Sequence, residues 1–465
     1  MNDDQQLLSR LYQACAPKAP ASVDQYVDCA AARGSGALTQ ELLNHLARAQ
    51  DYRCFLFSGH VGCGKSSELE ALRRALASPD GQRDGACYFP VFLDVSDYLD
   101  DFDVSVVDIL LAIVSELASA LRIELGIELK DGYFSDRLNE LKSLLLSDVE
   151  LRDGDLTLGI AKLKVQRLKQ NDVARQQVRE ALLPRMSTML DEINHVFDEA
   201  RQRLAELAVK RGLPPWRDIV LILDNLEKIR KLSDEAEGTA SHRNLFIDRN
   251  SQLTGLKTHV IYTEPLRLVR SADGPQLNSR YDHVFVLPMV KVCERVSRRP
   301  YLPGMAALRE LLQKRVGERP LDEVIAPEAL DFLLTYSGGN VRHLIGLIQQ
   351  ACADATFIPI PLPVARRAVR GLVSTYSTAI PEAHWARLAR LDLSIDQRIP
   401  NGEPDYLTML ENLSVLEYLN GGGEADPFVE SMPWYAAHPI VRELAPFKDE
   451  RGRQQQLAAA TSTSQ

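Results

Sequence analysis

The chain has 465 residues, of which 45% are hydrophobic and 25% charged, a balance typical of globular proteins rather than disordered or fibrous ones. A chain of this length exceeds a single core, so about two to four domains are expected. With 54 basic against 64 acidic residues the formal charge is -10, which argues against a protein that coats nucleic acid.

The chain carries no obvious targeting or membrane segment. Its first residues lack a basic stretch followed by an apolar one, so we expect no secretory signal. The most apolar stretch, 104–121, is short and interrupted by Asp108 and Glu116, which predicts a buried helix rather than a membrane span. The seven cysteines show no metal-ligand spacing and are odd in number, which predicts free thiols in a reducing compartment. We therefore expect a cytoplasmic protein with no structural metal.

The first hundred residues predict helices and then two strands. Residues 1–45 are expected to form an N-terminal helical region. The apolar run 54–58 leads into a glycine, as in a buried parallel strand, and 67–77 carries leucines at helical spacing. A second strand is expected at 87–95, although Pro90 would cost a hydrogen bond in a central strand.

A long helical insertion is expected before the next strand, because the separation far exceeds an ordinary crossover. We place this insertion at about 104–215. Residues 156–165 alternate and predict a small hairpin. Apolar residues at steps of three and four across 171–211 predict one long amphipathic helix. Packing of that helix on the core is favoured over a projecting coiled-coil arm.

Strands and helices alternate after the insertion, which predicts a parallel α/β sheet followed by a helical domain. We expect the core, insertion included, to span 46–295 and a helical lid to span 296–357. The expected strands are 218–223, 259–263 and 283–287, and the expected lid helices are 305–316, 327–336 and 340–355.

The strongest motif is a glycine-rich loop of the form G-x-x-x-x-G-K-S between the first strand and its helix. Its glycines allow backbone N–H groups to converge on a phosphate where a Cβ would clash. Lys65 can reach the β- and γ-phosphates, and Ser66 is placed to bind Mg²⁺. The motif predicts a site for ATP or ADP with Mg²⁺. It comprises Gly59, His60, Val61, Gly62, Cys63, Gly64, Lys65 and Ser66, with Ser67 following; Cys63 is interpreted as a spectator thiol rather than a redox sensor.

An acidic motif follows the strand at 218–223. This strand is expected to lie beside the strand of the glycine-rich loop and to deliver Asp224 to the site, where its carboxylate would hold Mg²⁺ through water. Many ring-forming ATPases carry a glutamate directly after this aspartate, but here the residue is Asn225. The next acid, Glu227, is our candidate for the general base.

Three further residues are candidates for sensing the nucleotide. Thr263 ends a strand and could orient the attacking water, although a structural threonine is an alternative. Arg280 lies just before the last strand and could act as an arginine finger offered to a neighbouring subunit, or be an ordinary surface arginine. Arg342 opens a lid helix after a glycine turn, from which it could reach the nucleotide.

The order of these motifs resembles the AAA+ and STAND branch of P-loop ATPases over about 52–355. GHVGCGKS, LILDNLEK, VIYT, the Arg280 region and SGGNVR carry the resemblance. The layout is similar to archaeal-type, origin-recognition-like ATPases, which implies a lid followed by a winged helix. The D-x-x-E form of Asp224 and Glu227 is more similar to NACHT-type switch ATPases, which implies control of assembly by nucleotide. The absence of glutamate at position 225 argues against fast hydrolysis.

The C-terminal part, 365–447, is predicted to be a winged helix. We expect one leucine-rich helix over 404–419, a turn, a wing-like segment at 433–436 and a last helix near 438–444. Acidic residues outnumber basic ones here, so packing on the ATPase or a partner is favoured over DNA contact. The polar tail 448–465 is expected to be disordered.

The sequence thus predicts an α/β P-loop NTPase with a parallel sheet, a large helical insertion, a helical lid and a winged helix. The favoured function is a slowly hydrolysing ATP-dependent switch that forms a homo-oligomer on ATP binding and controls a separate effector protein. By analogy alone this would operate in stress or antiphage defence. The alternatives are a DNA-associated, origin-recognition-like loader and a nucleotide-stabilised scaffold; nucleic acid is possible but not favoured.

Overall fold

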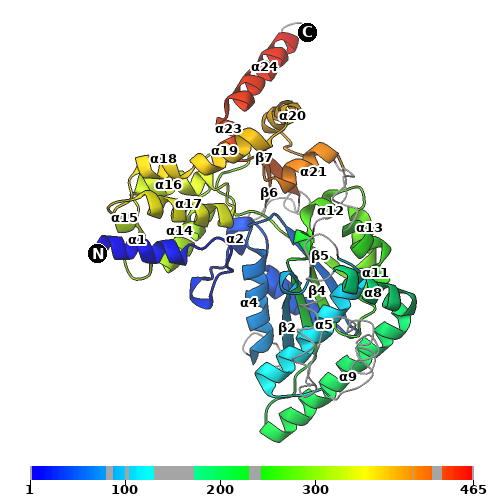
Figure 1. Ribbon diagram of the computed structural model, residues 1–465. Coiled ribbons are helices and arrows are strands. Elements are labelled where there is room, and N and C mark those ends of the chain that lie inside the picture. Colours follow the sequence, from blue (N-terminus) through cyan, green and yellow to red (C-terminus); the bar gives the residue numbers. More distant parts are fainter. Residues whose placement is uncertain are drawn as a thin grey trace.

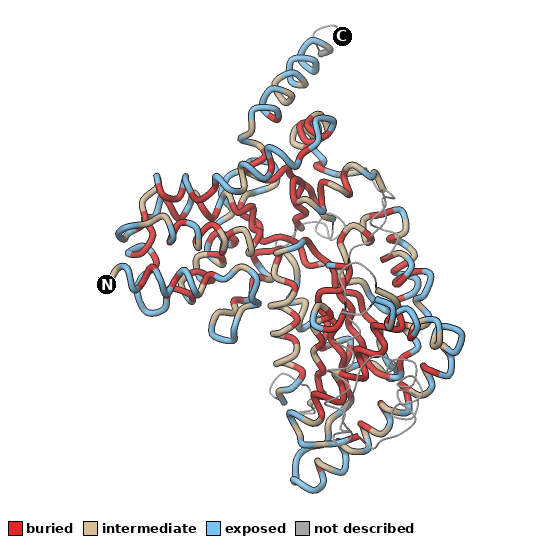
Figure 2. Tube along the Cα trace, viewed as in Figure 1, coloured by how far each residue is buried: buried red, intermediate tan, exposed pale blue. Residues whose placement is uncertain are grey.

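A computed structural model of the chain describes residues 3–79, 87–99, 104–129, 172–229, 242–400, 402–420 and 432–462. It consists of an α/β core, a helical lid beside it and a C-terminal domain above both (Figure 1). Buried residues concentrate in the central sheet and inside the lid (Figure 2). Within these ranges, no helix has the length and apolar character required to cross a membrane.

The core is built on a five-stranded, wholly parallel sheet in the order β2-β3-β4-β1-β5. Its inner strands are apolar on both faces, as expected of a sheet covered by helices on each side. The expected parallel α/β fold is therefore confirmed. The strands are β1 (Cys54–Gly59), β2 (Phe89–Asp94), β3 (Ile219–Asp224), β4 (His259–Pro265) and β5 (His283–Leu287).

The position of β2 at the edge of the sheet explains its proline. The backbone N–H of Phe89 donates to Asp218 O on the side of β3. Because successive N–H groups of a strand point to opposite sides, the nitrogen of Pro90 lies on the free edge, where no donor is required.

One expectation about the sheet is wrong: β3 does not lie beside β1, because β4 separates them. Leu223 is in register with Tyr262, and Phe57 is in register with Thr263. The end of β4 therefore stands between the acidic motif and the glycine-rich loop. This arrangement places Thr263 at the centre of the site rather than at its margin.

Helices cover both faces of the sheet. On one face α3 (Leu38–Arg48) and α4 (Lys65–Ala77) pack their leucines against inward-facing residues of β1, β3 and β4. On the other face lies α5 (Val106–Ala120), which is buried along almost its whole length, as expected for the stretch 104–121.

The predicted long helix of the insertion is two helices packed on the core. α8 (Asp172–Leu182) ends before a 3-10 turn, Leu183–Arg185, and α9 (Met186–Arg211) continues. The break falls at Pro184, which has no N–H for the helical ladder. Packing on the core, rather than projection as an arm, is confirmed by the buried positions of Ile193 and Phe197. The predicted hairpin 156–165 lies outside the described residues.

The lid is a bundle of helices that also includes the N-terminal helix. Leucines of α1 (Asp3–Ala14) share one apolar core with the lid helices, so the start of the chain belongs to this bundle. The lid helices are α14 (Leu302–Val316), α15 (Leu321–Val324), α16 (Pro327–Tyr336) and α17 (Val341–Asp354).

The C-terminal domain has the helix and hairpin order of a winged helix, but the expected helix over 404–419 is wrong. α21 (Pro404–Glu411) ends early, and β6 (Val415–Leu419) pairs antiparallel with β7 (Pro433–Ala437). Leu413 adopts a left-handed φ of 61°, which ends the helix, and the following residues then alternate as a strand. The helices before the hairpin are α18 (Leu362–Ala368), α19 (Arg370–Ala379) and α20 (Glu382–Leu393).

The expected disorder of 448–465 is also contradicted over 448–462, the part of the tail that the structure describes. After α23 (Pro439–Glu443), α24 (Ala445–Ser462) continues as a helix that projects from the domain (Figure 1). Its glutamine, leucine and alanine residues favour helix in spite of their low complexity.

Substitution Phe197→Ala tests the packing of α9 on the core. The side chain is fully buried, so its removal leaves a cavity and should lower the free energy of unfolding by about 3–5 kcal/mol in urea titrations. Val209→Ala, at a position 85% exposed on the same helix, is the control and should change it by less than about 0.5 kcal/mol. Equal effects of the two variants would contradict this packing.

Candidate nucleotide-binding site

The glycine-rich loop connects β1 to the N-terminus of α4, with Lys65 as the first helical residue. Gly62 and Gly64 adopt left-handed φ values of 80° and 110°. A Cβ added at Gly62 would lie 2.6 Å from Asn340 Oδ1 and 2.7 Å from Arg342 Cβ. The loop therefore needs glycine both for its backbone conformation and for its contact with the lid.

Lys65 is buried at the centre of the site. Its Nζ donates to Gly59 O at 3.0 Å and His60 O at 3.2 Å, and it lies 3.1 Å from Glu227 Oε1. Burial alone would lower the pKa of Lys65, but the Glu227 carboxylate outweighs it and the pKa is raised. The lysine is therefore held as a cation, the form that binds phosphate.

Asp224 and Glu227 meet at this edge of the sheet in two different states. Burial, and then the charge of Glu227, raise the pKa of Asp224, whereas a hydrogen bond with Ser66 opposes the rise. Burial would also raise the pKa of Glu227, but Lys65 outweighs it and the pKa is lowered. Glu227 Oε2 is buried without a hydrogen-bond partner. Glu227 is thus paired with Lys65 through Oε1, while its other oxygen, Oε2, has no hydrogen-bond partner.

The turn between the two acids has a defined conformation. Asn225 adopts a left-handed φ of 70°, and its N–H donates to Asp224 Oδ1 at 2.8 Å. The N–H of Leu226 donates to Thr263 Oγ1 at 3.0 Å. Thr263 therefore positions the acidic turn, in addition to any contact with water. Burial would raise the pKa of Glu227, but Lys65 lowers it, and a separate hydrogen bond with the Thr263 hydroxyl adds to that lowering.

The oxygen donors fit Mg²⁺. Ser66 and Asp224 supply a hydroxyl and a carboxylate that are already hydrogen-bonded to each other, and Glu227 Oε2 is an unpartnered buried oxygen nearby. The described residues contain no group of three or more His, Cys, Asp or Glu side chains that could hold a metal ion. That result agrees with the usual coordination of Mg²⁺ at phosphate sites, where one or two protein oxygens act with water and phosphate oxygens.

The lid helix α17 begins on the glycine-rich loop. The N–H of Arg342 donates to Gly62 O at 3.0 Å, and Asn340 Nδ2 donates to Val61 O at 2.9 Å. Arg342 lines the pocket at the loop, together with the predicted residues Val61, Gly62, Gly64, Lys65, Ser66 and Ser67. The expected place of Arg342 next to the phosphate loop thus agrees with the geometry.

The N-terminal segment is a part of the site that the motif analysis missed. Residues 17–29 cross the mouth of the pocket, where Ala21 N–H donates to Ser67 Oγ at 3.0 Å and Tyr26 OH donates to Glu68 Oε2 at 2.8 Å. Arg33 is buried and donates to Cys63 O at 2.7 Å and to Pro288 O. The sequence here carries the turn-forming run ARGSG at 32–36, which does not indicate what Arg33 contacts.

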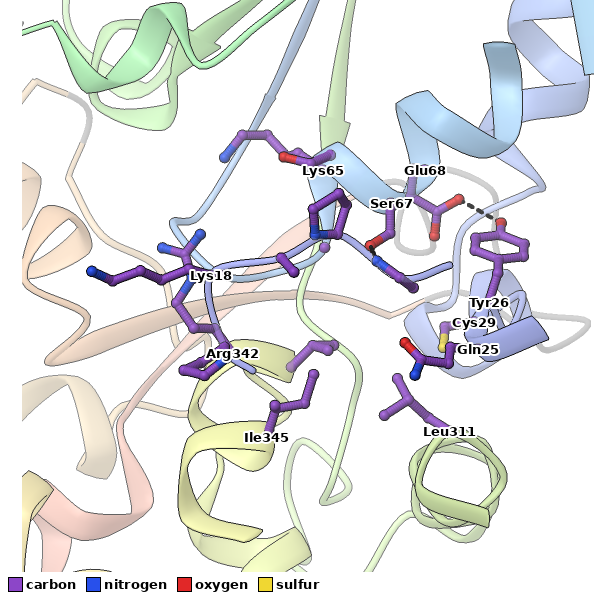
Figure 3. A pocket seen from close by; sticks show the side chains of 18 of the residues that line it. Lys18, Gln25, Tyr26, Cys29, Lys65, Ser67, Glu68, Leu311, Arg342 and Ile345 are labelled. Atoms are coloured by element: carbon purple, nitrogen blue, oxygen red, sulfur yellow. Dashed lines mark hydrogen bonds between the residues drawn. The ribbon is translucent and has the colours of Figure 1, made fainter. Parts of the chain in front are cut away.

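Figure 3 shows the two sides of this pocket. Lys18 and Arg342 lie on one side, and Tyr26 and Cys29 lie on the other. Ile345 and the other apolar lining residues Val27 and Leu311 come from the N-terminal segment and the lid. The pocket thus combines cations with an apolar part formed by Val27, Leu311 and Ile345.

His60 and Cys63 belong to the loop but face away from the pocket. Cys63 is fully buried in the core on the α4 face. His60 Nε2 accepts from Glu417 N–H at 2.9 Å, so its Nδ1 carries the proton and donates to Leu410 O at 3.1 Å. Burial lowers the pKa of His60 to about 4. A neutral histidine therefore ties the phosphate loop to the C-terminal domain.

Arg280 is not part of this site within one chain. It is the last residue of α13 (Gly274–Arg280), directly before β5. It therefore lies at the amino end of β5, whereas the glycine-rich loop follows the carboxyl end of the neighbouring strand β1. Its guanidinium donates to Ile247 O at 2.8 Å and to Asn250 Oδ1 at 3.0 Å. A role toward a neighbouring subunit remains a prediction.

Comparison with known proteins gives distant structural likeness only. No known family model matches the chain, and no curated protein matches it. The chain is similar to the structure of the Aeropyrum pernix ORC1 protein in complex with DNA, with a TM-score of 0.40, 12% identity and coverage of 97% of this chain and 98% of that one. It is also similar to the structure of Drosophila ORC bound to DNA, with a TM-score of 0.38, 11% identity and coverage of 84% and 73%. These values carry no functional argument, so the assignment rests on the site itself.

Substitution His60→Gln tests the tie between the loop and the C-terminal domain. Because the pKa of His60 is about 4 in the folded chain and near 6.5 when unfolded, the unfolded state binds more protons between these values. The contribution of neutral His60 to the free energy of unfolding is therefore essentially full above about pH 6.5, and it is lost as the pH falls toward about 4. Between about pH 7.5 and about pH 5.5 we expect a loss of about 1 kcal/mol from this residue, measured by urea unfolding.

The His60→Gln variant should show a correspondingly smaller loss of stability on acidification, because glutamine does not titrate. Exposed His195→Gln on α9 is the control and should retain the wild-type dependence on pH. An unchanged pH dependence in the His60 variant would contradict the assigned role.

Proposed function

We infer that the chain is a Mg²⁺-dependent ATPase of the AAA+ and STAND type that works as a slowly hydrolysing molecular switch. The observation that carries this proposal is the meeting of Lys65, Asp224 and Glu227 at the end of a parallel sheet, beside Ser66. Lys65 would contact the β- and γ-phosphates, and Ser66 and Asp224 would hold Mg²⁺. The metal would neutralise phosphate charge when bound.

The apolar side of the pocket supports a nucleotide with a flat base. Val27, Leu311 and Ile345 line it, and they come from the N-terminal segment and from lid helices α14 and α17. A purine placed between these elements would bury its faces against aliphatic side chains. Base binding would thus join the N-terminal segment to the lid.

Slow turnover follows from the state of Glu227. A general base must be free to accept a proton from water, but Glu227 Oε1 is paired with Lys65 at 3.1 Å. Phosphate would have to displace Glu227 from the lysine before the carboxylate could accept a proton, and this adds a step to each turnover. Asn225, in place of an acid directly after Asp224, supplies no second base.

The contacts of the glycine-rich loop support a switch. Three separate parts of the chain hold it: Arg33 from the N-terminal segment, Arg342 from the lid and the C-terminal domain through His60. A phosphate that shifts the loop would shift all three. Control of assembly and of a separate effector protein is the output that we propose.

Packing of the C-terminal domain favours this switch over a DNA loader. In a winged helix the last helix before the hairpin is the one that enters a DNA groove. Here that helix, α21, packs against α12 (Leu266–Arg270), and Arg267 pairs with Glu411 at 2.7 Å. Glu417 of β6 accepts from Arg270 Nε at 2.7 Å. These ion pairs hold the domain against the core.

Two variants test the catalytic assignment. Lys65→Ala removes the phosphate contact and should weaken ATP binding by about 100-fold or more in calorimetric titrations. Glu227→Gln should retain binding within about tenfold while reducing turnover, measured as phosphate release, by about 100-fold. The matched control is Glu70→Gln on α4, which pairs with Arg73 of the same helix and should change neither. Unchanged turnover in Glu227→Gln would favour a scaffold instead.

Oligomerisation tests the proposed role of Arg280. A non-hydrolysable ATP analogue, but not ADP, should increase the mass measured by light scattering. Arg280→Ala should abolish that increase without weakening ATP binding, because the residue lies far from the site of its own chain. Arg299→Ala, at an exposed position in the core-to-lid connection, serves as a control for loss of an arginine. An undiminished mass increase in Arg280→Ala would rule out the finger.

A further inference from the structure

A second hollow adjoins the nucleotide pocket, between the lid and the C-terminal domain. Its volume is about 1080 Å³. Its walls come from α17, from α18 and the start of α19, and from the residues at the mouth of the nucleotide pocket. We call it the basic cleft; its lining consists of Pro17, Lys18, Lys228, Arg342, His343, Gly346, Leu347, Gln350, Asp354, Arg367, Ala368, Arg370, Gly371 and Leu372.

Five cations and one acid line the basic cleft. The structure describes no ion pair for any of the five cations Lys18, Lys228, Arg342, Arg367 and Arg370 among the residues it covers. Many arginines elsewhere in the chain are paired, and the chain as a whole has a charge of -10. An uncompensated basic surface in an acidic protein is typical of a site for an anionic partner.

The cleft walls also have an apolar and open part. Leu347 and Leu372 face it together with Ala368. Gly346 and Gly371 stand on its two helical walls, and a Cβ at either would meet open space. Glycine within a helix costs about 1 kcal/mol relative to alanine, and here it keeps the cleft wide.

We propose that the basic cleft binds an acidic protein segment that carries an apolar side chain. Carboxylates of the segment pair with the cations, and its apolar side chain packs on the leucines. A nucleic acid fits less well. No phenylalanine, tyrosine or tryptophan lines the described walls for base stacking, and a duplex would extend its remaining phosphates over a molecule of net negative charge.

The cleft and the nucleotide pocket share cations. Lys18, Lys228 and Arg342 line both. This coupling rests on the proposed function, because it requires ATP in the pocket. Phosphate charge would lower the positive potential in the cleft, so ATP should weaken binding of the acidic segment. Linkage then requires the segment to weaken ATP binding by the same factor.

Fluorescence anisotropy on the full chain tests this proposal. The probe is a fluorescein-labelled peptide that repeats Glu-Glu-Leu-Glu, and the competitors are an oligothymidine and a DNA duplex. We expect saturable binding that Arg367→Glu or Arg370→Glu weakens at least about tenfold. Arg366→Glu is the matched control, since Arg366 is exposed on the same helix but does not line the cleft, and its effect should stay within about twofold.

A second variant separates docking from folding. Gly346→Leu fills the cleft while replacing a helical glycine, so it should stabilise α17 and still weaken peptide binding about tenfold. Binding that all three charge variants reduce equally, or that Gly346→Leu leaves unchanged, would overturn the proposal. Binding of DNA in preference to peptide, with the same dependence on Arg367, would replace it with a nucleic-acid site.

Repeating the peptide titration with ATP and Mg²⁺ distinguishes the cleft proposal from the proposed nucleotide switch. Weakening of peptide binding by ATP and Mg²⁺ in wild type, but not in Lys65→Ala, would support the coupling. Peptide binding without any effect of ATP would leave the cleft assigned and contradict the coupled switch. ATP binding without peptide binding would contradict the cleft alone.

Discussion

A buried ammonium group requires an anion close by, and the arrangement of the core follows from how Lys65 obtains one. Its partner, Glu227, comes from the end of β3, which β4 separates from the loop strand. The distance is bridged because Asn225 turns the chain in a left-handed conformation and Thr263 holds the turn by its hydroxyl. Sheet order, turn and lysine are thus parts of one electrostatic arrangement.

The same loop has little backbone freedom left. Gly62 lies against the lid, Cys63 O accepts from Arg33, and His60 binds the backbone of the C-terminal domain. On the side of the loop, these contacts are made by backbone atoms or by a histidine that burial keeps neutral, and the Arg33 guanidinium that binds Cys63 O is itself buried. A ligand that binds the loop therefore acts on rigid hydrogen bonds rather than on mobile side chains, which is the condition for transmitting a small shift over a distance.

Sequence reasoning succeeded where the information was local. The glycine-rich loop and the strands need only their own residues to be recognised, and Asp224 follows from the apolar run before it. It failed where contacts join distant segments. Arg33 and His60 carry no local pattern that names Pro288 or Glu417 as partners. The position of β4 between β1 and β3 is likewise a property of the whole sheet.

The error over 404–419 has a different cause. Leucines at every third position match the local helical spacing i, i+3, so the pattern gave no sign that the helix ends before residue 415. The left-handed Leu413 marks the change from helix to strand.

Charge placement unites the two candidate binding regions. The chain is acidic overall, yet its cationic groups gather where the glycine-rich loop meets the lid. Acidic surroundings repel anions generally, so a group of cations such as the one at this junction favours the approach of an anion. Lys18, Lys228 and Arg342 line both hollows, so on the proposals above they would serve nucleotide and partner from a common set of charges. Because one set of cations cannot fully compensate two anions at once, competition between them follows from the geometry itself and requires no separate relay.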